Sequence, residues 1–318
     1  MRRDTALMVC MILLGFGCST ERNPRDLLAP GQVGIVVVDA QLLVGKSMPR
    51  IRLAVTQSPE EPYVRGLAGL DGASVTVASS AGDTIRYEAT SAEPGMYGPA
   101  EEPPGYLVLP NTTYSLRVVA RDGAIVTAET TTPDRFTVRE WALLDEPTLA
   151  LRRRLATRDE LGDDGDSVYA AEANQLIYQD GLLEARFDRG SALAFQLGLF
   201  SRDAGSPIVI DADFLNAEDL ARLERETSWP PVDAVEDAIR LPWYAVFFEG
   251  RYDIKVFSVD RNWYDLARSL QSFGNSTIGF GSTAGDDFER PIFHVNGGIG
   301  LFGSAAMDET GCTIHPRP

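Results

Sequence analysis

Closely spaced carboxylates are the residues of this chain whose type and spacing most directly suggest chemistry. Asp211 and Asp213 alternate along the end of an expected strand, which points both side chains to one face. Such a pair could supply the acid and base of a hydrolase, or bind a divalent cation. Because the chain holds 46 acidic residues, we interpret the pair as solvated loop carboxylates and predict no catalytic role for it.

A second acidic group lies in the loop around residues 159–166. Asp163, Asp164 and Asp166 offer hard oxygen ligands with a glycine between them, a composition that suits calcium better than zinc. They lack the spacing of an EF-hand loop, which ends in a bidentate glutamate. The sequence therefore predicts no metal and no cofactor, and a calcium site in this loop is the alternative.

Nucleophilic catalysis has few candidate residues in this chain. His294 and His315 are its only histidines, and no Gly-x-Ser-x-Gly elbow occurs near a strand-to-helix turn. Of the three cysteines, Cys312 alone is expected to remain as a free thiol, so no internal disulfide is possible. We predict that Cys312 is an inert residue of a late strand and that the protein is not an enzyme.

Two further patterns could bind ligands. Trp229-Pro230-Pro231 and Trp243-Tyr244 could stack on sugars or peptides, but in a chain with four tryptophans packing inside the protein is favoured. The glycine-rich residues 296–303 lack the Lys-Ser/Thr pair of a phosphate-binding loop. We interpret them as a strand whose backbone packs too closely for side chains.

The elements that must position these residues are mostly short strands separated by turns. Residues 31–133 have the rhythm of an Ig-like β-sandwich domain. Its clearest hairpin joins residues 114–120 to residues 124–130 through Asp122-Gly123, a dipeptide that favours a tight turn. Along the first arm Tyr114, Leu116 and Val118 share one face, as expected of a half-buried strand.

A connector and exposed acidic loop is predicted for residues 134–167, followed by a second β-rich domain over residues 168–318. Two short helices are expected in this second domain, at residues 216–226 and 260–271, with Asn216 and Asp260 as their caps. The apolar stripe of the later helix predicts core packing. It consists of Trp263, Leu266, Ala267 and Leu270.

The chain begins like an exported precursor. Arg2 and Arg3 precede an apolar stretch that is too short to span a membrane, and Gly17-Cys18 follows. We predict a signal peptide over residues 1–17, a lipid on Cys18 and a polar tether over residues 18–30. The usual lipobox has Leu three residues before the cysteine, whereas Leu14 lies four before it. A plain secretory signal and a short uncleaved anchor are the alternatives.

The charge of the chain excludes some classes of partner. Its formal net charge is −17, and removal of Arg2, Arg3 and Asp4 with the leader takes away a net +1, which leaves −18. Such a surface repels phosphate backbones and anionic headgroups. We therefore predict no nucleic-acid partner and no electrostatic attraction to anionic membranes.

The succession of motifs resembles the DUF4249 family, lipoproteins of unknown function found mostly in Bacteroidetes and related bacteria. The matching segments, in chain order, are residues 36–40, 72–77, 94–97, 113–118, 256–259 and 296–303. They resemble the strand, "gA-V", "pG-Y", "tY-L-V" and closing "N-GG-G-F" succession of that family. The shifted lipobox and the helix at residues 216–226 depart from its pattern.

The resemblance implies an envelope lipoprotein that is often encoded beside TonB-dependent outer-membrane transporters, and it transfers no catalytic residue. We accordingly expect an outer-membrane protein held by the lipid on Cys18, acting as a non-catalytic binding or accessory component. The alternatives are a structural or adhesive envelope protein and a carboxylate-dependent hydrolase of glycan or peptide.

Overall fold

The computed structural model describes residues 33–58, 62, 64, 66–91, 93–101, 106–162, 165–210, 218, 223–241, 243–271 and 291–318. Within them the chain is mainly β, as predicted, with its strands arranged in two sheets. The predicted signal peptide, the tether and Cys18 lie outside the described residues. No helix among the described residues is long and apolar enough to cross a membrane.

The N-terminal unit contains seven strands, of which all but β5 follow the predicted rhythm. They are β1 (Val36–Leu43), β2 (Ile51–Val55), β3 (Ser74–Ser79), β4 (Thr84–Ala89), β5 (Met96–Pro99), β6 (Thr113–Val119) and β7 (Ile125–Thr131). Their hydrogen-bonded order is β1-β2-β5-β4-β3-β6-β7. Alternate residues of these strands are buried in one hydrophobic core.

The predicted hairpin of β6 and β7 is confirmed. Tyr114, Leu116 and Val118 are buried, and the turn places Gly123 at a φ of 89°. The N–H of Gly123 donates to the carbonyl of Ala120 at 3.0 Å, which closes the turn. A residue with a side chain is strained at this φ, which explains the glycine.

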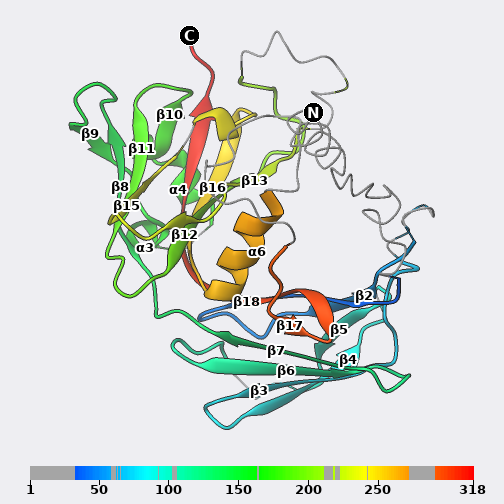
Figure 1. Ribbon diagram of the computed structural model, residues 1–318. Helices are drawn as coiled ribbons and strands as arrows, with labels where there is room; N and C mark the ends of the chain where they lie inside the picture. Colours follow the sequence, from blue (N-terminus) through cyan, green and yellow to red (C-terminus); the bar gives the residue numbers. More distant parts are fainter. Residues whose placement is uncertain are drawn as a thin grey trace, which may run out of the picture.

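The last strand connects the two units, and this corrects the predicted boundaries. β17 (Val295–Asn296) pairs with β7, and the start of β18 (Gly298–His315) pairs in parallel with β1. The rest of β18 pairs with β16 (Gly250–Val259) of the second unit. The assignment of all of residues 168–318 to a second domain is therefore wrong for residues 295–305. Figure 1 shows β18 running from the lower unit to the upper one.

The glycines of this junction pack as predicted. Gly300 has a φ of 107°, and a Cβ built on it would lie 2.1 Å from the carbonyl oxygen of Val38. A Cβ on Gly298 would lie 2.6 Å from the carbonyl oxygen of Val36. Side chains are thus excluded where β18 lies against β1.

The second unit combines the far end of the large sheet with a separate four-stranded sheet of order β15-β11-β8-β9. Its remaining strands are β8 (Val138–Leu144), β9 (Leu151–Arg154), β10 (Gln175–Ile177), β11 (Leu182–Phe187), β12 (Ala194–Ser201), β13 (Glu226–Ser228), β14 (Val232–Asp233) and β15 (Ala238–Arg240). Short helical turns are α3 (Arg158–Leu161), α4 (Ser167–Ala170), η2 (Glu172–Asn174) and η3 (Trp243–Ala245).

The segment predicted as a connector, residues 134–167, is instead part of the second core. It supplies β8 and β9, and the side chains of Trp141 and Leu143 are buried among those of β11 and β12. The prediction failed because the arginines of β9 and the acidic run that follows it conceal the apolar strand before them. Only residues 159–162, 165 and 166 are exposed as expected of the acidic loop, and the first three of them belong to the helical turn α3.

The predicted helix at residues 260–271 is confirmed as α6 (Arg261–Gln271). It contacts β18 and lies between the two units (Figure 1). Its apolar stripe is only half-buried where described, at Trp263, Leu266 and Ala267, whereas its fully buried side chains are the polar Asp265 and Ser269. The helix predicted at residues 216–226 lies mostly outside the described residues, and Glu226 begins β13.

Candidate functional site

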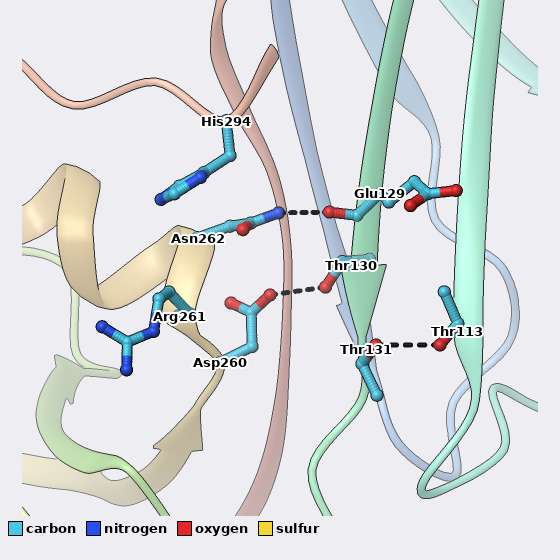
Figure 2. A pocket seen from close by; sticks show the side chains of 8 residues that line it. All are labelled: Thr113, Glu129, Thr130, Thr131, Asp260, Arg261, Asn262 and His294. Atoms are coloured by element: carbon cyan, nitrogen blue, oxygen red, sulfur yellow. Dashed lines mark hydrogen bonds between the residues drawn. The ribbon is translucent and has the colours of Figure 1, made fainter.

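A cavity lined mainly by polar side chains lies where α6 meets β7. It has a volume of about 320 Å³, and His294, on the segment before β17, closes one side (Figure 2). Both units contribute to its wall. The lining residues are Thr113, Glu129, Thr130, Thr131, Asp260, Arg261, Asn262 and His294.

Asp260 is the central carboxylate of this cavity, and it occupies the position between the end of β16 and the start of α6. As the helix cap, its Oδ1 accepts from the backbone N–H of Trp263 at 2.9 Å. Its Oδ2 accepts from the hydroxyl of Thr130 on β7 at 2.5 Å, and this hydroxyl lies 2.8 Å from that of Ser304 on β18. One buried side chain thus holds three elements together.

Asn262 reinforces the same junction. Its amide nitrogen donates to the carbonyl of Glu129 at 2.5 Å and to the carbonyl of Phe302 at 2.8 Å. These bonds connect the first turn of α6 to both β7 and β18, and Figure 2 shows the one to Glu129 of β7. Asp260 and Asn262 thus bond across the two units, whereas the Thr113, Thr131 and Glu129 side chains bond within the first unit.

His294 is paired with Asp265 of α6. Its Nε2 lies 2.8 Å from the Asp265 carboxylate, whose other oxygen accepts from the Arg268 guanidinium at 2.9 Å. A histidine and a carboxylate could act together as a base, provided that a nucleophile lies within reach. Thr130 is the buried hydroxyl of the cavity, and its bond to Asp260 assigns it a structural role.

Burial raises the pKa of the Asp260 carboxyl above its usual range, while the bonds from Thr130 and from the N–H of Trp263 oppose the shift. The folded state thus favours the protonated form. Stability from this group is fully present at pH values below the carboxyl pKa of the unfolded chain and is lost as the pH rises through the raised folded pKa.

We expect Asp260→Asn to remove this pH dependence while keeping the fold. Asparagine is an equally good helix cap, and its amide can donate to Thr130 if that hydroxyl turns to Ser304. As the pH rises from 4 to 7, the variant should gain stability relative to the wild type in urea unfolding. Asp260→Ala, which leaves donors unpaired, should lose about 2 kcal/mol. A wild-type-minus-Asn difference that stays constant with pH would contradict the assignment.

A second polar cluster lies inside the second unit and includes the end of the predicted acidic loop. The Tyr169 hydroxyl donates to the buried Asp253, which also accepts from Arg158 at 2.6 Å. Asp166 is paired with Arg251 at 3.2 Å. Asp163 and Asp164, the other residues of the alternative calcium site, lie outside the described residues.

The outer face of the four-stranded sheet carries a chain of alternating charges. Arg240 and Arg186 both pair with the buried Glu184, at 2.8 and 2.7 Å. Glu140 then pairs with Arg186 at 2.8 Å and with Arg154 at 2.7 Å. Burial alone would raise the pKa of Glu184, but its two arginines hold it below the usual range. Each charge has a partner, so this network is structural.

The other predicted candidates take structural positions wherever they are described. Trp229 packs edge-on against Tyr244, with ring centroids 4.9 Å apart, and the indole N–H of Trp243 donates to the carbonyl of Gly181 at 2.7 Å. His315 bonds to Gln175 at 2.8 Å. Asp211 and Asp213 lie outside the described residues.

Cys312 is completely buried in β18, and this burial raises the pKa of its thiol. A buried thiol with a raised pKa is a poor nucleophile, as predicted for a late-strand residue. Among the described residues, no three His, Cys, Asp or Glu side chains gather in a way that could hold a metal ion.

Sequence reasoning did not anticipate the junction at Asp260. It identified Asp260 only as a helix cap, because a cap requires one local signal. Thr130 lies 130 residues before Asp260 in the sequence. Ser304, which bonds to Thr130, lies 174 residues after it. Their polarity at buried strand positions was the available signal, since a threonine or serine facing a core needs a hydrogen-bond partner.

The fold and this junction define a class of protein: two β-rich units that share one long strand and are held together by buried polar side chains. A family model described as a domain of unknown function, DUF4249, matches residues 28–310. The chain belongs to this family, which confirms the resemblance seen in its motifs. No curated protein is significantly similar to it.

Proposed function

We propose that the chain is an outer-membrane lipoprotein, cleaved before Cys18 and lipidated there, that serves as a non-catalytic binding or accessory component of a TonB-dependent transport system. Its leader and its Gly17-Cys18 pair support the anchor. The polar spacer after Cys18 supports a domain held near a membrane partner, where tethering raises its effective concentration.

The observation that supports the non-catalytic part of the proposal is that the threonine hydroxyls lining the cavity already have hydrogen-bond partners. The Thr130 hydroxyl bonds to Asp260 and Ser304, and the hydroxyls of Thr113 and Thr131 bond to each other. Among the described lining residues, the pair of His294 and Asp265 therefore has no unpaired hydroxyl to activate. The bonds of Asp260 and Thr130 instead hold the two units together, which suits a rigid binding module.

Co-purification tests the partner. The full lipidated chain with a C-terminal tag should recover a TonB-dependent transporter from solubilised outer membranes. The matched control carries the same leader, Cys18 and spacer on an unrelated soluble domain, so that the lipid is present and the β units are not. We expect recovery with the full chain only.

Two outcomes would replace this proposal. If no transporter is recovered and the purified domain cleaves a glycan or peptide, with activity abolished by Asp211→Asn or Asp213→Asn, the protein is the hydrolase alternative. If neither a transporter nor turnover is found and the domain associates with itself, the structural or adhesive alternative holds.

A further inference from the structure

Exposed apolar side chains gather where the described fold begins. Leu67 is 76 % exposed, Val33 is 56 % exposed and Val64 is 46 % exposed, and we call these three the entry patch. Large apolar side chains that are this exposed cost free energy in water, and a group of them commonly marks an interaction surface.

Backbone bonds place the entry patch around the end of β2. The N–H of Gly34 donates to the carbonyl of Thr56 at 2.9 Å, and the N–H of Val55 donates to the carbonyl of Ala68 at 2.8 Å. Val33 and Leu67 therefore flank the last residues of β2 on its two sides. Val64 joins them because its carbonyl accepts from the N–H of Leu67 at 3.0 Å.

A cavity of about 450 Å³ opens beside the entry patch on the face of β1 and β2. Val37, Ala54 and Val55 form its apolar part. Gln57 lines it as well, and the Oε1 of this side chain is buried without a hydrogen-bond partner. Asp39 and Arg52 line the cavity too, so apolar and polar side chains lie side by side on this surface.

The position of the entry patch along the chain indicates its occupant. Cys18 lies fifteen residues before Val33, so that even a fully extended spacer reaches about 50 Å at most. Val33, the first described residue after the anchor, is therefore a member of the entry patch, which places this patch within reach of the membrane. Electrostatic attraction cannot hold an acidic chain to an anionic membrane, whereas apolar contact with a neutral one can.

We propose that the entry patch is the face that the protein lays against the lipid bilayer, in contact with zwitterionic headgroups such as phosphatidylethanolamine. This inference rests on the proposed lipid anchor and adds an orientation to it. The negative net charge of the chain disfavours anionic headgroups.

An environment-sensitive fluorophore on a single cysteine tests the orientation. Leu67→Cys provides the position for the fluorophore. The other cysteines of the lipidated protein should not react with it, because Cys312 is fully buried and the thiol of Cys18 carries the lipid. The matched control is Val235→Cys, which is equally exposed at 71 % but lies between β14 and β15 in the second unit. Each lipidated variant is reconstituted into phosphatidylethanolamine and phosphatidylcholine vesicles that carry nitroxide-labelled headgroups.

The expected result is a blue-shifted emission at position 67 and a loss of emission by nitroxide quenching severalfold greater than at position 235. Equal quenching at the two positions overturns the proposed orientation, and it leaves the anchor intact. Mass spectrometry of the N-terminal peptide from the same samples distinguishes the two claims. If that peptide carries no lipid, the anchor is refuted and the orientation falls with it.

Discussion

Gly300→Ala is expected to destabilise the protein by about 3 kcal/mol or more, because its effect combines two costs. The φ of 107° is strained for any residue with a side chain, at about 1–3 kcal/mol. In addition, the new Cβ would lie 2.1 Å from the carbonyl oxygen of Val38, which is backbone and cannot move alone. Relieving this overlap must separate β18 from β1, at a further cost of about 1–3 kcal/mol.

Gly82→Ala is the matched control for this prediction. Gly82 has a φ of 106°, almost the same as that of Gly300, but a Cβ there would meet nothing within 4 Å. The difference between the two variants in urea unfolding therefore isolates the close approach of the strands. If both variants lose the same stability, the packing of β18 against β1 is not as described, and only the backbone conformation matters.

Local signals in the sequence were sufficient for several elements of the fold. The hairpin of β6 and β7 could be predicted because its turn requires Gly123, and each strand alternates apolar and polar residues. The helix α6 could be predicted because Asp260 is a capping residue directly before it. In both cases the determining residues are neighbours in the sequence.

Non-local pairing could not be predicted in the same way. The glycines of residues 296–303 indicated close packing, but nothing in that run identifies β1, more than 250 residues earlier, as the partner. The sequence also does not reveal that β18 belongs to both units. Its first half contributes to one core and its second half to the other. A domain boundary inferred from composition assumes that each domain is one continuous segment, whereas here the end of the chain pairs with strands of the N-terminal unit.

The candidate site shows the same division. His294 and Asp260 were recognisable as ionisable groups, but their roles depend on Asp265, Thr130 and Ser304, which come from three different elements. The apolar stripe of α6 was expected to pack on a core, and its Trp263 does pack on a small buried cluster. The fully described side chains that are buried on this helix are nevertheless the polar Asp265 and Ser269. The polar junction between the units outweighs the hydrophobic pattern there, because a charged group is buried only where its partners are in place.

Cys18→Ala is expected to abolish lipidation completely. Metabolic labelling with a palmitate analogue should tag the wild-type chain and leave the variant unlabelled, because the thiol of Cys18 is the only proposed attachment point. The variant should also leave the membrane fraction, because it lacks the proposed lipid. Cys312→Ala is the matched control, because its thiol is buried in the folded protein and should not affect labelling.

Equal labelling of the wild type and of Cys18→Ala would refute the lipoprotein proposal, and with it the orientation inferred for the entry patch. Loss of label with retention in the membrane fraction would instead indicate that the leader remains uncleaved as a short anchor. That case is distinguishable by mass, because the retained leader adds residues 1–17 to the N-terminal peptide. The imperfect lipobox, with Leu14 one residue too far from Cys18, makes this labelling comparison the decisive measurement for the proposed localisation.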